Sequence, residues 1–213
     1  MSAHRAFIVS HTALASPDAV PEIRLHLASE VTPLWHSSAE TFEKEGIEPP
    51  YWAFAWAGGQ ALARYLLDEP DAVRGRAVAD IGSGSGIVAL AAKRSGAKRV
   101  VAFDIDPVSL TACTLNAEAN ELVIEVECRD IVGDPLEGYD VVLIGDLFYE
   151  EGPAKRIHAW AKELARAGKV VLVGDPGRAY LPSGLVEVFA REMATSLDLE
   201  SAASKRVAVY RLG

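Results

Sequence analysis

The chain has few residues suited to covalent cross-links or metal binding. It contains only two cysteines, Cys113 and Cys128, and neither lies in a C-x-x-C or metal-ligand spacing. The first falls in a predicted helix and the second at a predicted strand end, which favours buried free thiols in a reducing compartment. The five histidines are scattered, without the H-x-x-H or H-E-x-x-H spacing of zinc sites. The sequence therefore predicts neither a disulfide framework nor a metal site.

The chain also lacks long apolar runs and an excess of basic residues. No apolar segment reaches the roughly 20 residues that a membrane-spanning helix needs. Residues 1–9 resemble neither a secretory signal nor an Arg-rich transit peptide, so we expect a cytoplasmic protein. The formal net charge is -9. This charge disfavours broad nucleic-acid binding, which needs a basic face, and fits a cationic ligand or a locally basic partner.

The alternation of element types predicts the fold. The chain of 213 residues, 50% of them hydrophobic, is long enough for one well-cored domain. We expect residues 57–213 to form it and residues 1–56 to be an N-terminal extension that closes the site. Strand-like segments alternating with helical ones predict a doubly wound, mostly parallel α/β sheet. The expected central strands cover residues 76–81, 99–103, 123–127, 139–144 and 169–173.

Both ends of the chain add strands to this prediction. Residues 23–27 alternate apolar and polar side chains, as in a half-buried strand. Near the C-terminus the pattern predicts a short helix over residues 185–190 and two strands over 194–199 and 205–212. Because no helix separates these two strands, we expect an antiparallel C-terminal hairpin.

A glycine-rich turn follows the first central strand. Gly82, Gly84 and Gly86 alternate with serines, directly before a helical run. Glycine allows positive φ and close approach of the backbone to a ligand. The spacing differs from the G-x-G-x-x-G of dinucleotide-binding turns, and Asp80 would repel a pyrophosphate. An acid at this position suits S-adenosylmethionine, which carries an ammonium and a sulfonium. The alternative is a structural strand-to-helix turn without a ligand.

Acidic residues recur at the carboxyl ends of the later strands, where doubly wound sheets bind ligands. Asp104 comes about twenty residues after the glycine turn and is placed to accept the ribose hydroxyls, whereas Asp106 is better placed to cap the next helix. Asp130 could accept from an adenine amino group or be a surface turn acid. Asp175 follows the fifth strand. The recurrence predicts one ligand site along this edge.

Two further features point to the reacting group. Asp146 and Tyr149 lie at i and i+3 just past the fourth strand, facing the expected reactive end of the cofactor. The alternative is that Asp146 caps a turn and Tyr149 packs in the core. Trp56 ends an aromatic cluster over residues 51–56. This cluster could form a wall for a flat base or a lysine stem, or could seal the edge of the core.

These motifs together resemble a known enzyme group. The glycine turn with Asp80, Asp104 after the second strand and Asp-x-x-Tyr at 146–149 resemble the seven-stranded, class I S-adenosylmethionine-dependent methyltransferases, which have a Rossmann-like sheet. The last motif is similar to the D/E-x-x-Y/F motif of the subgroup that methylates protein lysines. The chain from about residue 23 onward resembles the electron-transfer flavoprotein β-subunit lysine methyltransferases. The segments that carry this narrower likeness are residues 34–35, 50–59, 145–149 and 174–178.

The resemblance implies residue roles and a substrate. Asp146 and Tyr149 would engage the target lysine, with Asp146 also near the cofactor, and Trp56 would contact the cofactor. Gly82 and Gly84 would approach its methionine part, beside Asp80, and Asp104 its ribose, with Asp130 near the base. The implied activity is trimethylation of lysines beside the flavoprotein's recognition loop.

The resemblance also bears on the setting of the protein. It implies a bacterial or mitochondrial protein, and the missing presequence favours bacteria. We expect a monomer. Three alternatives stay open at this point: a methyltransferase of a small amine, an NAD-dependent oxidoreductase, and a non-catalytic module that keeps the cofactor fold.

Overall fold

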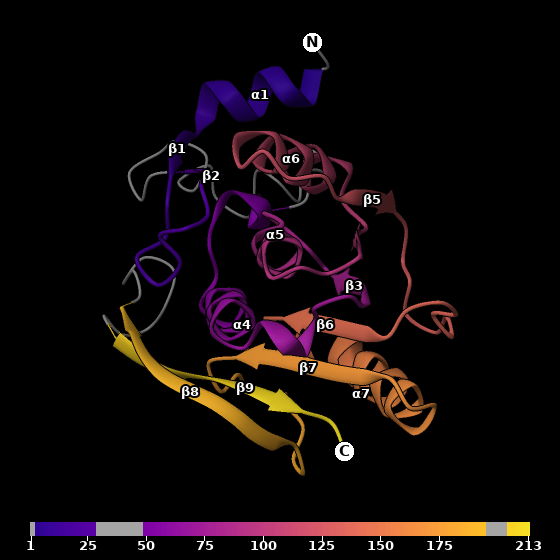
Figure 1. Ribbon diagram of the computed structural model, residues 1–213. Helices are drawn as coiled ribbons and strands as arrows, with labels where there is room; N and C mark the ends of the chain where they lie inside the picture. Colours follow the sequence, from indigo (N-terminus) through magenta and orange to yellow (C-terminus); the bar gives the residue numbers. More distant parts are fainter. Residues whose placement is uncertain (1–2, 29–48, 195–203) are drawn as a thin grey trace.

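The computed structural model describes residues 3–28, 49–194 and 204–213, and within them the central feature is a seven-stranded sheet in the order β5-β4-β3-β6-β7-β9-β8 (Figure 1). The first five strands in this order are parallel, whereas β9 pairs antiparallel with both β7 and β8. The predicted doubly wound, mostly parallel sheet with an antiparallel C-terminal hairpin is confirmed. The strands are β3 (Ala77–Ile81), β4 (Arg99–Asp104), β5 (Glu125–Cys128), β6 (Val141–Gly145), β7 (Val170–Asp175), β8 (Val186–Ala194) and β9 (Ser204–Arg211).

Helices cover both faces of the sheet because its central strands, β3, β4, β6 and β7, are apolar on both sides. In β6, Val141 and Leu143 pack with helices α4 and α5. Val142 and Ile144 point the other way and pack with α7. Strands with two buried faces are typical of parallel sheets enclosed by helices. The helices are α4 (Ala57–Asp68), α5 (Ile87–Arg94) and α6 (Pro107–Ala119) on one face and α7 (Glu151–Arg166) on the other (Figure 1).

The N-terminal segments join this core at α6. Helix α1 (Ala3–His11) lies over α6 in Figure 1, followed by the short antiparallel pair β1 (Ala13–Ala15) and β2 (Leu25–Leu27). Ile8 of α1 packs in one cluster with Trp52, Ala53 and Phe54, and with Ala112 and Leu115 of α6. The cluster includes the short 3-10 turn η1 (Tyr51–Ala53); a second such turn, η2 (Pro70–Ala72), follows α4. The boundary at residues 56 and 57 stays a prediction.

Two buried asparagines hold the N-terminal strand: Asn116 in the last turns of α6 and Asn120, which follows the helix as its C-cap. Asn116 accepts a hydrogen bond at Oδ1 from the backbone N–H of His26 (2.7 Å) and donates from Nδ2 to the carbonyl oxygen of Ser85 (2.8 Å). Asn120 accepts from Arg24 N (2.9 Å) and donates to the Arg24 carbonyl (2.6 Å). Buried amides require such partners. Asn116 therefore links the strand pair β1–β2 to the glycine-rich turn.

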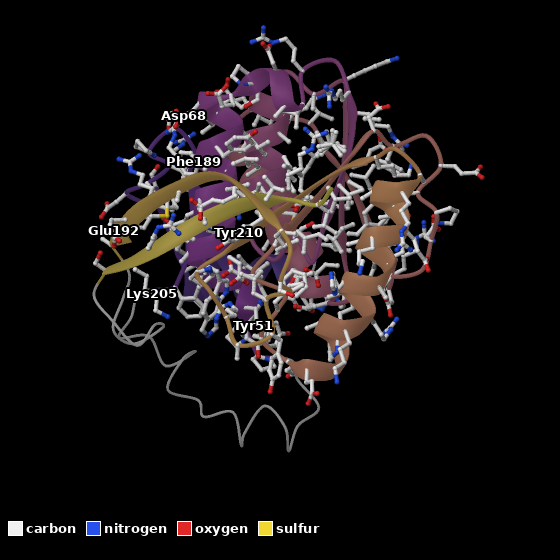
Figure 2. All side chains as sticks on the ribbon, turned by 90° about the horizontal axis from the view of Figure 1, so that it is seen from below. Tyr51, Asp68, Phe189, Glu192, Lys205 and Tyr210 are labelled. Atoms are coloured by element: carbon white, nitrogen blue, oxygen red, sulfur yellow. The ribbon has the colours of Figure 1, made fainter. Side chains whose placement is uncertain are left out.

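The C-terminal region differs from the sequence prediction. The helix predicted over 185–190 is wrong, because β8 occupies Val186–Ala194. Alternation of Val186, Glu187 and Val188 suits a strand, and pairing with β9 satisfies its backbone. Of the strand predicted at 194–199, all but Ala194 lies outside the described residues. Figure 2 shows this hairpin running along one side of the molecule. Glu192 and Lys205 lie near one end of the hairpin, and Phe189 and Tyr210 lie nearer the middle of the molecule. Strand β1 has no counterpart among the strands predicted from the sequence.

Helix α4 lies against the sheet through two glycines. A Cβ on Gly58 would meet the carbonyl oxygen of Gly174 in β7 and lie 2.8 Å from Asp146 Oδ2. A Cβ on Gly174 would meet the Gly58 carbonyl and lie 2.9 Å from Leu62 Cβ. Backbone on both sides leaves no atom that could move aside easily. Only glycine at both positions allows this approach.

We expect Gly174→Ala to lower the free energy of unfolding by roughly 1–3 kcal/mol, because the added methyl overpacks a contact with backbone. Urea unfolding monitored by circular dichroism measures this change. Gly152→Ala is the matched control, since this residue of α7 has no atom within 4 Å of an added Cβ. The control should be neutral or more stable by roughly 0.5–1 kcal/mol. Equal stability of Gly174→Ala and the wild type would contradict the contact.

Candidate active site

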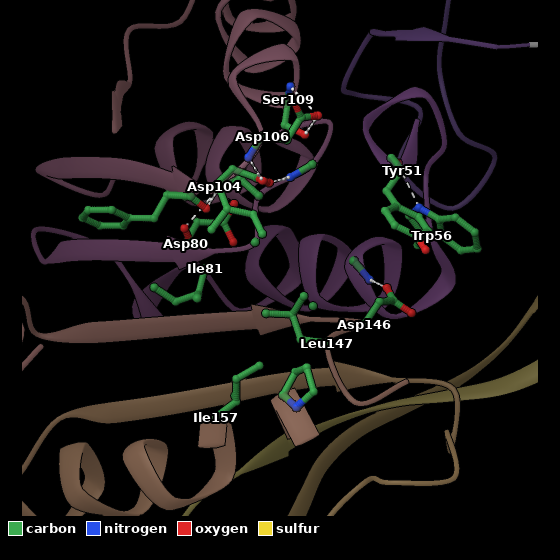
Figure 3. Close-up of a pocket in the computed structure, with 18 of the residues that line it drawn as sticks. Tyr51, Trp56, Asp80, Ile81, Asp104, Asp106, Ser109, Asp146, Leu147 and Ile157 are labelled. Atoms are coloured by element: carbon green, nitrogen blue, oxygen red, sulfur yellow. Dashed lines mark hydrogen bonds between the residues drawn. The ribbon is translucent and has the colours of Figure 1, made fainter. Parts of the chain in front are cut away.

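A cavity of about 560 Å³ opens at the carboxyl ends of β3, β4 and β6, within the range typical of small-molecule sites. It gathers every residue that the sequence assigned to catalysis or cofactor binding. Figure 3 shows Asp80, Asp104 and Asp106 toward one end of this cavity and Asp146, Trp56 and Tyr51 toward the other. Asp175 does not line it. The lining includes Trp56, Asp80, Gly82, Gly84, Asp104, Asp130, Asp146 and Tyr149.

The glycine turn is shaped by Asp104. The backbone φ angles of Gly82, Gly84 and Gly86 are 63°, 51° and 78°, in the left-handed region that glycine adopts without strain. Asp104 accepts from Gly84 N at Oδ2 (2.9 Å) and from Asp106 N at Oδ1 (3.0 Å). Asp106 in turn caps α6, as predicted. The carboxylate predicted to bind a ribose therefore also fixes the loop beside it.

Asp80 ties β3 to the start of α5. Its side chain is 1% exposed, and Oδ2 accepts from Ala89 N at 3.1 Å. Burial raises the pKa of Asp80 to about 7, against the smaller opposing effects of the Ser83 and Ala89 hydrogen bonds. The residue lines the cavity, so this structural contact stands beside its predicted contact with a cofactor.

Asp130 makes the contacts expected of a turn acid. Its Oδ1 accepts from Val132 N (3.0 Å) and its Oδ2 pairs with Arg156 of α7 (3.0 Å). The Arg156 guanidinium is the main reason that the pKa of Asp130 is lowered. Both alternatives from the sequence therefore remain compatible with its position at the cavity wall, and the adenine contact stays a prediction.

Asp146 is held by groups from two other elements. It is 8% exposed, and its φ of 58° is unusual for a residue other than glycine. Its Oδ2 accepts from Gly59 N at the start of α4 (2.6 Å), and its Oδ1 pairs with Arg178 Nη2 (2.8 Å). Its own N–H donates to Gly174 O (3.0 Å). Burial raises the pKa of Asp146, although Arg178 and the α4 amides act in the opposite direction.

Arg178 lines the cavity and pairs with Asp146, which the sequence did not predict. The segment 174–178 contributed to the family resemblance, but no chemical role was assigned to the arginine. A basic residue after the fifth strand could have been matched to the acid after the fourth, since β6 and β7 are neighbours in the sheet. That pairing becomes visible only when the register of the two strands is known.

Aromatic side chains border the Asp146 end of the cavity. Trp56 donates from Nε1 to the Tyr51 carbonyl (2.9 Å), and the Arg178 guanidinium lies 5.8 Å from the Trp56 ring centre. The rings of Tyr51 and Tyr149 are 5.9 Å apart. Tyr149 is 45% exposed, so it does not pack in the core. Trp52 is buried and seals the cluster with Ile8, as the alternative reading of the aromatic segment proposed.

The two acids after Tyr149 have different surroundings. Glu150 lines the cavity. Glu151 begins α7 and pairs with Lys155 at 2.6 Å.

Among the described residues, no group of three or more His, Cys, Asp or Glu side chains could hold a metal ion. Within the same ranges, no helix has the length and apolar character required to cross a membrane.

Residues 61–145 match the family described as ribosomal protein L11 methyltransferase (PrmA). A human protein named electron transfer flavoprotein beta subunit lysine methyltransferase is 43% identical over 177 residues, 82% of this chain and 66% of that protein. The rat protein of the same name is 41% identical, over 82% of this chain and 68% of its own length. The chain belongs to the electron transfer flavoprotein beta subunit lysine methyltransferase family. It spans about two thirds of the length of these family members.

Solved structures agree on the fold. Magnesium protoporphyrin IX methyltransferase from Synechocystis, crystallised with bound SAM, superposes with a TM-score of 0.53 at 16% identity, over 73% of this chain and 78% of that one. The ribosomal protein L11 methylase from Lactobacillus delbrueckii gives 0.51 at 23% identity, over 75% and 81%. These likenesses confirm that the present chain has the class I methyltransferase fold. The predicted family is confirmed as well.

One prediction about the setting is wrong. The sequence favoured a bacterial, cytoplasmic protein because residues 1–9 show no presequence. The family members that match over most of the chain include proteins from human, rat and zebrafish. The bacterial assignment is therefore contradicted. The error came from reading the residues at the start of the chain as a statement about origin.

We expect Asp80→Asn to become more stable relative to the wild type as the pH rises from about 4 to about 7. The folded-state pKa of Asp80 is raised from 3.8 to about 7, so between these pH values the folded protein keeps a proton that the unfolded chain has lost. The wild type is therefore destabilised as the pH rises through this window, whereas the asparagine variant is not. One pKa unit corresponds to about 1.4 kcal/mol, so the difference should reach a few kcal/mol. Urea unfolding at several pH values measures it. Asp71→Asn, at a side chain that is 89% exposed, is the control. A constant difference between Asp80→Asn and the wild type would contradict the buried charge.

Proposed function

We propose that this protein transfers methyl groups from S-adenosylmethionine to lysine side chains of the electron transfer flavoprotein β subunit. The observation that carries the proposal is a single cavity that joins the glycine turn and Asp104 at one end to Asp146 and Tyr149 at the other. The names of the family members supply the substrate. A small-molecule amine is the alternative acceptor, and it is an outcome of the test below.

The residues of the cavity fit this cofactor. A Cβ on Gly84 would meet only Trp52 Cα, at 3.9 Å, so the turn leaves open space where a ligand could approach its backbone. Asp104 offers carboxylate oxygens for ribose hydroxyls, and Asp80 supplies the acidic character that suits an ammonium. Trp56 and Asp130 complete the predicted contacts. When bound, S-adenosylmethionine supplies a methyl group on a positively charged sulfur.

The residues at the other end of the cavity would manage the acceptor amine. The lysine nitrogen must be neutral to attack, and its lone pair forms the new N–C bond as the S–C bond breaks and sulfur keeps the electron pair. Positive charge then develops on nitrogen, where the Asp146 carboxylate would stabilise it. The half-exposed Tyr149 hydroxyl would orient the amine, and Trp56 would flank its alkyl stem. These roles deepen the predictions made from the Asp-x-x-Tyr spacing.

The N-terminal extension would help to close this site. Tyr51, Phe54 and Trp56 all line the cavity, and they precede the proposed boundary at residues 56 and 57. The exposed faces of Tyr51 and Tyr149 border the Asp146 end, where an incoming side chain would arrive. We propose that the enzyme acts as a monomer on a folded protein substrate, without a nucleic-acid component.

We expect Asp104→Ala to weaken S-adenosylmethionine binding by roughly 10–100-fold, because it removes charge-assisted hydrogen bonds and the support of Gly84 N. Isothermal titration calorimetry gives the affinity. Asp71→Asn again serves as control, since it lies away from the cavity and should bind like the wild type. Wild-type affinity in Asp104→Ala would remove Asp104 from the cofactor site.

We expect Asp146→Ala to reduce methylation by about 100-fold or more while leaving cofactor affinity within a few-fold of wild type. The measurement is the intact mass of purified flavoprotein β subunit after incubation with enzyme and S-adenosylmethionine. Wild-type enzyme should add mass in whole methyl groups. Tyr149→Phe, which keeps the ring beside Tyr51, should slow transfer less than Asp146→Ala does.

Turnover like the wild type in Asp146→Ala would remove that carboxylate from the reaction. If the wild type itself adds no mass although it binds the cofactor, the flavoprotein is not the substrate and small amines are the next acceptors to test.

A further inference from the structure

The carboxylate proposed to face the target lysine is already paired with an internal cation. Arg178 Nη2 lies 2.8 Å from Asp146 Oδ1, and the two side chains are 20% and 10% exposed. The other carboxylate oxygen is held by Gly59 N. An ion pair this shielded from water is screened much less than a surface pair. The charge at this end of the cavity is therefore that of the pair, and Asp146 alone does not determine it.

The turn after β7 fixes the position of Arg178. Asp175 Oδ1 accepts from Gly177 N (2.8 Å) and from Arg178 N (2.7 Å). Gly177 has a φ of 84°, which allows the tight turn. On its other side the guanidinium lies over the Trp56 ring. Backbone, carboxylate and ring thus place the cation at Asp146 from three directions.

Amine methylation makes such a pair useful. A free lysine has a pKa of about 10.4 and is mostly protonated at neutral pH. An isolated carboxylate beside it would stabilise the protonated form, which has no lone pair to attack with. A guanidinium on the same carboxylate opposes this effect, since like charge disfavours the ammonium. The carboxylate still orients the nitrogen and can stabilise the charge that develops during transfer.

We propose that Arg178 is a positioning residue that balances the charge of Asp146, so that the target amine binds beside this carboxylate as the free base. The proposal rests on the proposed function. Among the described residues, Asp175 on β7 interacts electrostatically with Asp146, and the titratable side chains of Tyr51, Tyr149 and Glu150 line the same cavity. The first turn of α4 contributes only the amides of Gly58 and Gly59.

The test compares the pH dependence of kcat for Arg178→Gln and Arg178→Lys with the wild type, using the flavoprotein β subunit and saturating S-adenosylmethionine. Loss of the positive charge should raise the pKa of the bound amine. The acid limb of the profile of Arg178→Gln should therefore move to higher pH by about one unit or more, with the rate recovering in alkaline solution. Arg178→Lys keeps the charge and should keep the limb close to that of the wild type.

A merely structural role would lower kcat equally at every pH, and an unmoved limb in Arg178→Gln would overturn the proposal. If this variant does not fold, Arg178→Met preserves the apolar stem near Trp56 and serves the same comparison. Failure of both to fold would assign Arg178 to the architecture and overturn the proposal as well. Absence of methylation by the wild type would instead refute the proposed function, and this inference with it.

Discussion

The contact between Gly58 and Gly174 is the constraint on which the rest of the site depends. It brings the first turn of α4 onto the carboxyl end of the sheet, with no side chain between the two backbones. Only at this distance can Gly59 N reach the Asp146 carboxylate. The same strand end supplies Gly174 O to Asp146 N, which helps to hold the residue in its left-handed conformation. The proposed acceptor end of the cavity thus depends on the close approach of these two backbones.

The acids of the cavity serve the structure as well as the proposed chemistry. Asp80 holds the start of α5, Asp104 holds the glycine turn, and Asp146 holds the start of α4. Each carboxylate thereby has a fixed orientation before any ligand is present. Fixed dipoles and charges cost no reorganisation during reaction, which is the main advantage of a preorganised site. For these three residues, a structural role therefore does not exclude a role in the proposed chemistry.

The central sheet and the cavity lining could be predicted from the sequence because both follow from local patterns. Alternation of apolar strands with helices determines which strand ends meet, and acids at those ends must gather there. The β8 strand was missed because its short apolar run, near Leu185, reads equally as helix or strand, and only pairing with β9 decides between them. Arg178 was missed for a related reason. Its partner, Asp146, follows the neighbouring strand β6, and the sequences of β6 and β7 do not by themselves determine how the two strands are aligned.

Asn116 connects two parts of the chain that the sequence separates by some sixty residues, because one amide bonds both the strand β2 and the carbonyl of Ser85 in the glycine turn. The amide can keep this orientation only while both partners are present. Pulling β2 away would leave a buried acceptor without its donor and free the amide to rotate away from the turn. The N-terminal strand pair therefore supports the glycine turn, and any event that loosens β2 acts on that turn through the Asn116 amide.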